Sequence, residues 1–283
     1  MKRIAVLGAG TMGAGIAHVG AQAGYDVVLY DISDQAVDNA RARIENNLQK
    51  GVDRGKVTKQ DMDKALSHLE TCTSIEAIEG CDLVIESAPE RVALKLEIYE
   101  AVNRVCGPNI LIATNTSSQS ITELAGGVAR PDLFVGMHFF NPVHIMRLVE
   151  LVRGLETSDE TVATIVEVSK TMGKEVVEVN EYPGFVTSRM NALIGNEAFR
   201  MLEEGVASAR DIDKAIKLGL NHPMGPFEMI DLVGLDTRLK TMEYLYGTLG
   251  ERFRPSVLHR KYVLAGRLGK KVGKGVYQYD TGE

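Results

Sequence analysis

Apolar and polar positions along the first half of the chain form blocks of two kinds. Short, mostly apolar runs with the length of buried strands alternate with stretches that have helical periodicity. The apolar runs occupy residues 3–8, 26–31, 69–72, 82–87, 110–114 and 133–140. Two of the helical stretches follow a favourable capping residue, Ser33 and Thr58. Because strands that alternate with helices form βαβ units, the pattern predicts a mainly parallel sheet covered by helices.

The pattern changes after residue 140. Residues 147–154 and 174–180 predict further strands, separated by a helix at about residues 158–172. We expect these strands to extend the sheet, with part of it antiparallel.

The segment "EYPG" at residues 181–184 marks a break in the chain. Pro183 disfavours a helix at the residue before it, and the glycine that follows relaxes the backbone. Beyond this point the pattern predicts helices, with a terminal strand at "GVYQYD", residues 275–280. Residues 228–247 are apolar around much of a helix, which suits burial against the same domain or against a partner subunit.

The length of 283 residues is sufficient for two domains, each with its own core. We expect an α/β domain with a mainly parallel sheet at residues 1–182 and an all-α domain at residues 183–283. The balance of 45% hydrophobic and 25% charged residues is typical of a soluble globular protein. A net charge of −6 argues against a nucleic-acid partner.

The cysteines and the apolar segments exclude further classes. The three cysteines have no CxxC or Cys/His spacing, so neither a disulfide framework nor a metal site is expected. No segment has the length needed to span a bilayer, and the apolar run at the N-terminus is too short for a signal peptide. We therefore expect a cytoplasmic protein with no membrane partner.

A glycine-rich loop follows the first predicted strand. In "VLGAGTMGAG", Gly8, Gly10 and Gly13 have the spacing G-x-G-x-x-G at the start of a helical pattern, which is typical of a loop that binds a dinucleotide pyrophosphate. Asp31 ends the second strand, where its carboxylate can bind the ribose hydroxyls of adenosine and would repel a 2′-phosphate. The loop therefore predicts NAD as cofactor, bound by Gly8, Gly10, Thr11, Met12, Gly13 and Asp31.

A carboxylate interrupts one of the apolar runs. Glu150 lies within "LVELV", where a buried charge needs a partner. If the flanking strands pair antiparallel, His138 lies opposite Glu150. A histidine oriented by a carboxylate is a suitable general base for removal of a hydroxyl proton. A structural ion pair and a Glu on a solvated face of the sheet remain alternatives at this point.

Together these motifs resemble the L-3-hydroxyacyl-CoA dehydrogenase family, and most closely its short bacterial members that act on 3-hydroxybutyryl-CoA. The resemblance covers the whole chain and is carried by "GAGTMGAGIA", "DLVIESAPE", "ATNTSS", "GMHFFNPVHIMRLVELVRG", "PGFVTSRM" and "KLGLNHPMGPFEMIDLVGLD". It implies a Rossmann-like NAD domain, a helical C-terminal domain that forms a homodimer, and reversible oxidation of an L-3-hydroxyacyl-CoA to the 3-oxoacyl-CoA.

The resemblance also implies roles for individual residues. His138 would be the general acid/base oriented by Glu150, and Ser117 would hydrogen-bond the substrate 3-oxygen. Asn141 would support the same pocket, and Asn115 would lie near the nicotinamide. Glu90 and Lys95 match positions that contact the nicotinamide-side ribose. The basic residues expected to receive the phosphates of coenzyme A are Lys50, Arg54 and Lys56.

One position departs from the family pattern. The residue before the Arg in "PGFVTSRM" is usually Asn, whose amide contacts the substrate, and here it is Ser188. Serine can still donate a hydrogen bond, although it lacks the paired donor and acceptor of an amide.

The sequence also bears on three other functions. A β-hydroxyacid dehydrogenase that acts on a free acid needs a Lys at the start of its C-terminal helix, and "FVTSRMNALIGNEAFRM" has none. A UDP-sugar dehydrogenase needs a nucleophilic Cys, and none follows Cys106. A dinucleotide-binding protein that has lost catalysis is the alternative from another class. The presence of Ser117, His138 and Glu150, which the resemblance marks as catalytic, argues against a loss of catalysis.

Overall fold

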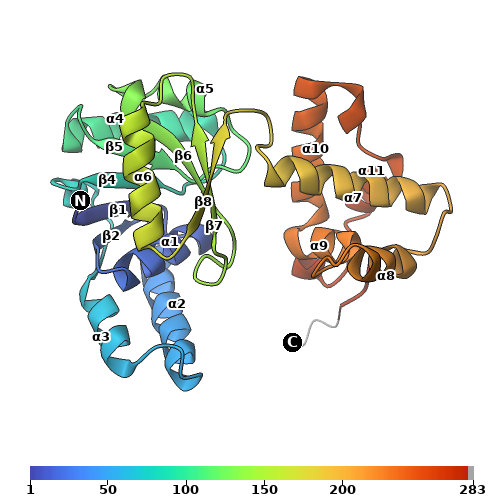
Figure 1. The fold of residues 1–283 in the computed structure, drawn as a ribbon, viewed down its shortest axis with the longest axis horizontal. Coiled ribbons are helices and arrows are strands. Elements are labelled where there is room, and N and C mark those ends of the chain that lie inside the picture. Colours follow the sequence, from blue (N-terminus) through green and yellow to red (C-terminus); the bar gives the residue numbers. More distant parts are fainter. Residues whose placement is uncertain (280–283) are drawn as a thin grey trace. The chain divides into compact units, whose positions relative to one another are not determined.

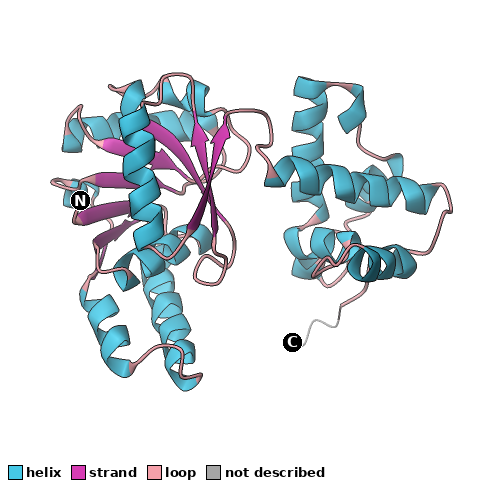
Figure 2. Cartoon of the chain, viewed as in Figure 1, coloured by secondary structure: helices cyan, strands magenta, loops and turns pink. Residues whose placement is uncertain are grey.

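The computed structural model describes residues 1–279 and divides the chain into compact units, Met1–Tyr182 and Pro183–Glu283. Figure 2 shows strands flanked by helices in the first unit and helices in the second. No helix among the described residues is both long and apolar enough to cross a membrane.

The first unit is built on one eight-stranded sheet with the order β3-β2-β1-β4-β5-β6-β7-β8 (Figure 1). The β6–β7 pair is antiparallel and the other neighbouring pairs are parallel. The predicted strands of this unit are thereby confirmed, including the partly antiparallel extension. The strands are β1 (Arg3–Leu7), β2 (Asp26–Tyr30), β3 (Leu69–Cys72), β4 (Leu83–Glu86), β5 (Leu111–Thr114), β6 (Phe134–Phe139), β7 (Leu148–Arg153) and β8 (Glu175–Asn180).

Helices cover this sheet, and two of them begin at the predicted capping residues. The Ser33 side chain accepts a hydrogen bond from the Ala36 N–H, and Thr58 forms a reciprocal capping box with Asp61. Helix α6 runs across the sheet in Figure 1 and packs on β6, β7 and β8. The helices are α1 (Thr11–Gln22), α2 (Asp34–Asp53), α3 (Lys59–Ser67), α4 (Val92–Cys106), α5 (Ile121–Ala125) and α6 (Asp159–Thr171).

The order of the strands places the cofactor loop. The strand order reverses between β1 and β4, and in sheets of this kind ligands bind beyond the carboxyl ends of the strands at that point. The glycine loop follows β1 directly, and the segments after β4, β5 and β6 begin at the same edge of the sheet because these strands are parallel.

The second unit is helical, and its core contains Phe199, Phe227 and Ile230. The single helix predicted for residues 228–247 is wrong. The helix ends at Gly234, whose φ of 106° is unfavourable for residues with a side chain, and a new helix begins at the next residue. The helices are α7 (Thr187–Glu203), α8 (Ala209–Gly219), α9 (Pro226–Val233), α10 (Leu235–Leu249) and α11 (Val257–Leu264).

The predicted terminal strand at residues 275–280 is also wrong for residues 275–279. Asp280 lies outside the described residues. The segment forms isolated bridges through Lys274 and Gln278 instead of a strand. The buried Asp231 carboxylate accepts hydrogen bonds from the Val276 N–H at 2.8 Å and the Tyr277 N–H at 2.9 Å. It also accepts one from the Tyr279 hydroxyl at 2.8 Å. These bonds hold the segment on α9 as a turn.

Replacing Asp231 by Ala should therefore destabilise the helical unit. The change leaves several donors unpaired, and we expect a loss of about 3 kcal/mol or more in the free energy of unfolding. Urea unfolding followed by circular dichroism measures this loss. The Glu204→Ala variant removes an exposed carboxylate from the same unit and should change the stability by less than about 0.5 kcal/mol. Equal losses for the two variants would contradict the role of Asp231.

Candidate active site

The N-terminus of α1 offers a site for an anion. Gly10 caps the helix without a side-chain hydrogen bond, and the first turn contains no acidic residue. Apart from Gly10 and its two chain neighbours, no heavy atom of the described residues lies within 4 Å of the position that a Cβ on Gly10 would occupy. The open backbone N–H groups and the positive end of the helix dipole can therefore receive a pyrophosphate.

The other glycines of the loop are required by close packing. A Cβ on Gly13 would lie 1.8 Å from the Gly8 carbonyl oxygen, so the helix can approach the turn only with glycine there. Gly8 has a φ of 102°, and a Cβ on it would lie 2.6 Å from the Ser87 carbonyl oxygen. Gly8 and Gly13 are therefore required by packing, and Gly10 leaves the helix terminus open, which supports a dinucleotide loop.

Asp31 is fixed beside this loop. One of its carboxylate oxygens accepts a hydrogen bond from the Ala9 N–H at 2.8 Å, and the other accepts one from the Ser33 N–H at 3.2 Å. Asp31 therefore ties the end of β2 to the glycine loop. A carboxylate held there can bind ribose hydroxyls, so the residues present fit NAD.

The predicted pairing of His138 with Glu150 is present. The two residues are directly opposite in the antiparallel β6–β7 ladder, and His138 Nδ1 lies 2.8 Å from Glu150 Oε2. Both residues are buried, and the imidazole packs on Phe140 with ring centroids 4.5 Å apart. The carboxylate fixes one ring nitrogen and so sets the orientation of the other.

Asn115 links the ends of three strands. Its side-chain oxygen accepts a hydrogen bond from the Phe139 N–H at 2.9 Å, next to His138 in β6. Its amide nitrogen donates to the Ser87 hydroxyl at 3.2 Å, just after β4. Strand β6, which carries His138, is thereby tied to the segment at Ser87 that also packs on Gly8.

Glu86 is a positioning residue that sequence reasoning missed. This fully buried carboxylate at the end of β4 accepts hydrogen bonds from Lys95 at 2.7 Å, Tyr99 at 2.8 Å and Thr114 at 2.7 Å. The sequence contains a sign of this role, because the apolar run "LVIE" includes an isolated carboxylate, as the run "LVELV" around Glu150 does. Glu86 joins β4, α4 (Val92–Cys106) and the end of β5 into one network.

The same network orients two predicted cofactor residues. Lys95 is fully buried and its ammonium also lies 3.5 Å from Glu90. The Glu90 carboxylate accepts hydrogen bonds from the Thr116 hydroxyl at 2.9 Å and the Ser117 N–H at 3.0 Å. The structure thus brings Glu90, Lys95 and Ser117 together, while their contacts with ribose and substrate stay predictions.

A second buried group supports the loop that joins β6 and β7. The Lys174 ammonium donates to the carbonyl oxygens of Val143 at 2.5 Å and Met146 at 2.9 Å. His18, on α1, is stacked on His144 of this loop with ring centroids 5.3 Å apart. Burial, with the nearby His144 and Lys174, lowers the pKa of His18 from 6.5 to about 4. These contacts hold the return loop between the strands that carry His138 and Glu150.

The remaining predicted residues are on other segments of the chain. Asn141 is exposed in the β6–β7 loop, and Ser188 is partly buried in α7 (Thr187–Glu203) of the other unit. The basic residues Lys50, Arg54 and Lys56 are exposed around the C-terminal end of α2. Their contacts with substrate stay predictions.

The glycine loop with its acidic partner and the buried His–Glu pair lie on one sheet, and together they define an NAD-dependent dehydrogenase. Comparison with protein families agrees. Residues 3–182 match the NAD binding domain of 3-hydroxyacyl-CoA dehydrogenase, and residues 184–279 match its C-terminal domain. The chain belongs to the 3-hydroxyacyl-CoA dehydrogenase family.

Individual relatives resemble the chain over its full length. A probable 3-hydroxybutyryl-CoA dehydrogenase of Bacillus subtilis is 44% identical over 281 residues, covering 99% of this chain and 98% of the relative. A 3-hydroxybutyryl-CoA dehydrogenase of Bradyrhizobium diazoefficiens is 43% identical over 280 residues, covering 99% and 96%. The crystal structure of (S)-3-hydroxybutyryl-CoA dehydrogenase from Ralstonia eutropha matches with a TM-score of 0.97 and 45% identity, covering 99% of this chain and all of that one.

The lowered pKa of His18 predicts a loss of stability in acid. Between a folded pKa of about 4 and an ordinary value of 6.5, the unfolded chain binds a proton that the folded chain does not. The free energy of unfolding should therefore fall as the pH is lowered through this range. The contribution of His18 between pH 7 and pH 5 is about 2 kcal/mol.

Urea unfolding of the wild-type protein and a His18→Gln variant at both pH values measures this contribution. The variant should lose about 2 kcal/mol less than the wild type on acidification. The control is His68→Gln, a change at a partly buried histidine of the same unit. Its free energy of unfolding should fall between pH 7 and pH 5 by as much as that of the wild type. An unchanged pH dependence in His18→Gln would contradict the assignment.

Proposed function

We propose that the protein catalyses reversible oxidation of an L-3-hydroxyacyl-CoA to the 3-oxoacyl-CoA with NAD. The preferred pair is 3-hydroxybutyryl-CoA and acetoacetyl-CoA, which the names of the relatives support. The observation that carries the proposal is the 2.8 Å contact between His138 Nδ1 and Glu150 on paired strands of an NAD-binding sheet.

The proton chemistry belongs to the His–Glu pair. With Nδ1 held by Glu150, His138 Nε2 takes the proton of the substrate hydroxyl, and the carboxylate stabilises the resulting imidazolium. Bound NAD supplies the hydride acceptor. In the reverse direction the imidazolium donates its proton to the 3-oxygen as the ketone is reduced.

Other residues bind and orient the substrate. Ser117 donates a hydrogen bond to the 3-oxygen, and its backbone is already fixed by Glu90. Asn141 supports the same pocket from the β6–β7 loop, and Ser188 contacts the substrate in place of the usual Asn. Glu90 and Lys95 contact the nicotinamide-side ribose.

The phosphates of coenzyme A contact the basic residues after β2. Lys50, Arg54 and Lys56 are exposed within seven positions of one another, so their charges can act on one polyphosphate. We also propose that the protein is a cytoplasmic homodimer that associates through its helical domain. Exposed apolar side chains in that domain support this assembly, namely Met190, Leu218, Leu220 and Leu232.

Nicotinamide absorbance with acetoacetyl-CoA tests the proposal directly. The protein should oxidise NADH rapidly and NADPH much more slowly, since Asp31 repels a 2′-phosphate. Free acetoacetate is the control for a β-hydroxyacid dehydrogenase and should not be reduced. Binding of NADH without turnover of any acyl-CoA would favour the non-catalytic alternative.

The His–Glu pair predicts the effect of two substitutions. His138→Gln should lower kcat about 10²-fold to 10⁴-fold, because it removes the general acid/base, while NAD affinity is kept. Glu150→Gln should also lower kcat, and both losses should exceed that of His144→Ala in the return loop. Steady-state kinetics and NADH titration measure these values. Near-wild-type turnover of His138→Gln would remove His138 from its role.

A further inference from the structure

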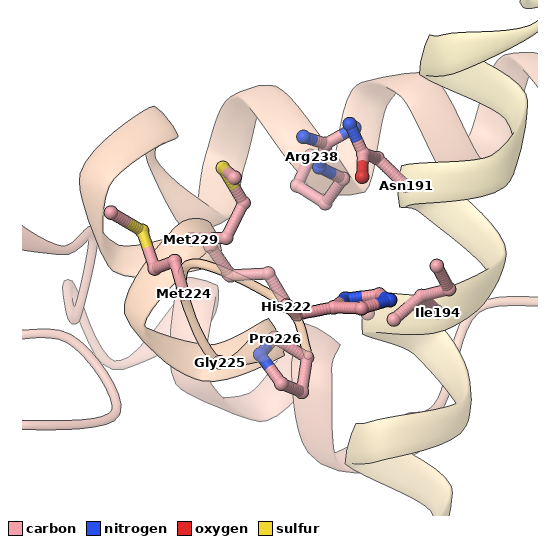
Figure 3. A pocket seen from close by; sticks show the side chains of 10 residues that line it. Asn191, Ile194, His222, Met224, Gly225, Pro226, Met229 and Arg238 are labelled. Atoms are coloured by element: carbon pink, nitrogen blue, oxygen red, sulfur yellow. The ribbon is translucent and has the colours of Figure 1, made fainter. Parts of the chain in front are cut away.

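A cavity in the helical unit is too small to hold an organic ligand. Asn191 and Ile194 line it from α7 (Thr187–Glu203), opposite Met224 and Met229 (Figure 3). Its volume is about 30 Å³, which is enough for about one or two water molecules. By contrast, a charged side chain of the first unit lies directly beside the cofactor loop.

That side chain is Arg43, a cation for which the proposed function has no role. It lies on α2 (Asp34–Asp53), and its guanidinium donates a hydrogen bond to the Thr11 hydroxyl at 3.3 Å. Thr11 is the first residue of α1 and directly follows Gly10, which caps the helix. The guanidinium therefore lies at the end of the helix that can receive a pyrophosphate.

The position of this charge is unfavourable for the chain alone. The N-terminus of a helix is the positive end of the helix dipole, so it repels a cation and favours a carboxylate. The first turn of α1 contains no acidic residue, and no ion pair joins Arg43 to a carboxylate of residues 1–279. Asp31, the carboxylate of this site, instead accepts hydrogen bonds from the N–H groups of Ala9 and Ser33. The convergence of two positive groups here points to an anionic ligand.

The pyrophosphate of NAD is an anion that fits between these groups. It carries two negative charges, whereas residues 8–13 of the loop contain no cationic side chain. A guanidinium matches two phosphate oxygens with parallel donors, so it adds a charge-assisted contact to those of the backbone N–H groups. The Arg43 side chain is exposed, so it can turn from the Thr11 hydroxyl to a phosphate oxygen at the same helical turn.

The basic residues proposed to bind coenzyme A lie further along the same helix. Lys50 follows Arg43 by seven positions, which places it on the same face of α2 and about 10 Å further along the helix axis. Arg54 follows one turn later, at the C-terminal end of the helix. Arg43 is thus the basic residue of this face that lies at the cofactor end.

We propose that Arg43 binds the pyrophosphate of NAD and so contributes to the affinity for the cofactor. The residue takes no part in proton transfer, which belongs to His138. The inference concerns the NAD-binding unit and holds for any acyl-CoA substrate.

Titration with NADH, followed by the change in its fluorescence, tests the proposal without turnover. Arg43→Gln removes the charge, and the Kd for NADH should rise at least about fivefold. Arg43→Lys keeps the charge without the paired donors and should raise the Kd less. The matched control is Arg41→Gln, which removes a cation of the same helix that is already paired with Glu45 at 3.1 Å. Its Kd for NADH should stay within about twofold of the wild-type value, because salt screens exposed charges that do not contact the ligand.

Competition against NADH locates the contact. The inhibition constant of ADP-ribose, which contains the pyrophosphate, should rise in Arg43→Gln by the same factor as the Kd for NADH. The inhibition constant of adenosine, which has no phosphate, should not change. Added salt should also weaken NADH binding less in Arg43→Gln than in the wild type, because the variant has lost a charge contact.

Three results would overturn the inference. An unchanged Kd for NADH with a raised KM for acetoacetyl-CoA would assign Arg43 to the phosphates of coenzyme A. Unchanged values of both would show that the guanidinium binds neither molecule. Equal losses for ADP-ribose and adenosine would show that the substitution alters the shape of the adenosine site.

Circular dichroism checks that each variant is folded, and Arg43→Met takes the place of Arg43→Gln if the latter is not. Failure of the proposed function would appear separately, as NADH binding without turnover of any acyl-CoA.

Discussion

The antiparallel pairing of β6 with β7 is the constraint on which the site depends. A carboxylate in the middle of a buried strand is unfavourable unless a partner lies opposite, and the register supplies His138 for Glu150. A shift of one strand by one residue would turn its side chain to the other face of the sheet, away from its partner. The Lys174 ammonium and the His18–His144 stack hold the loop that sets this register. The geometry of the proposed base is thus secured by contacts outside the two strands.

Buried charged side chains also hold separate segments together elsewhere in the molecule. Glu86 joins two strands and a helix through donors from α4 and β5, and Asp231 holds the terminal segment on α9. Each of these carboxylates has its partners within the chain.

The sequence predicted those parts of the fold that depend on local pattern. Apolar runs and capping residues such as Ser33 and Thr58 identified the strands and helix starts, and the spacing from residue 138 to residue 150 predicted the His–Glu contact. The prediction from sequence failed where a side chain that is distant along the chain determines the local structure. The alternation in "GVYQYD" indicated a strand, but the bonds to Asp231, more than 40 positions away, make it a turn. The helix break at Gly234 and the partners of Glu86 likewise depend on tertiary packing.

The central claim is that His138 and Glu150 act as one unit. A double-mutant cycle with His138→Gln, Glu150→Gln and the double variant, measured as kcat/KM for acetoacetyl-CoA with NADH, tests it most directly. If Glu150 acts through His138, the double variant should be no slower than His138→Gln alone. Losses that multiply in the double variant would show that the two residues act independently, and would contradict the account.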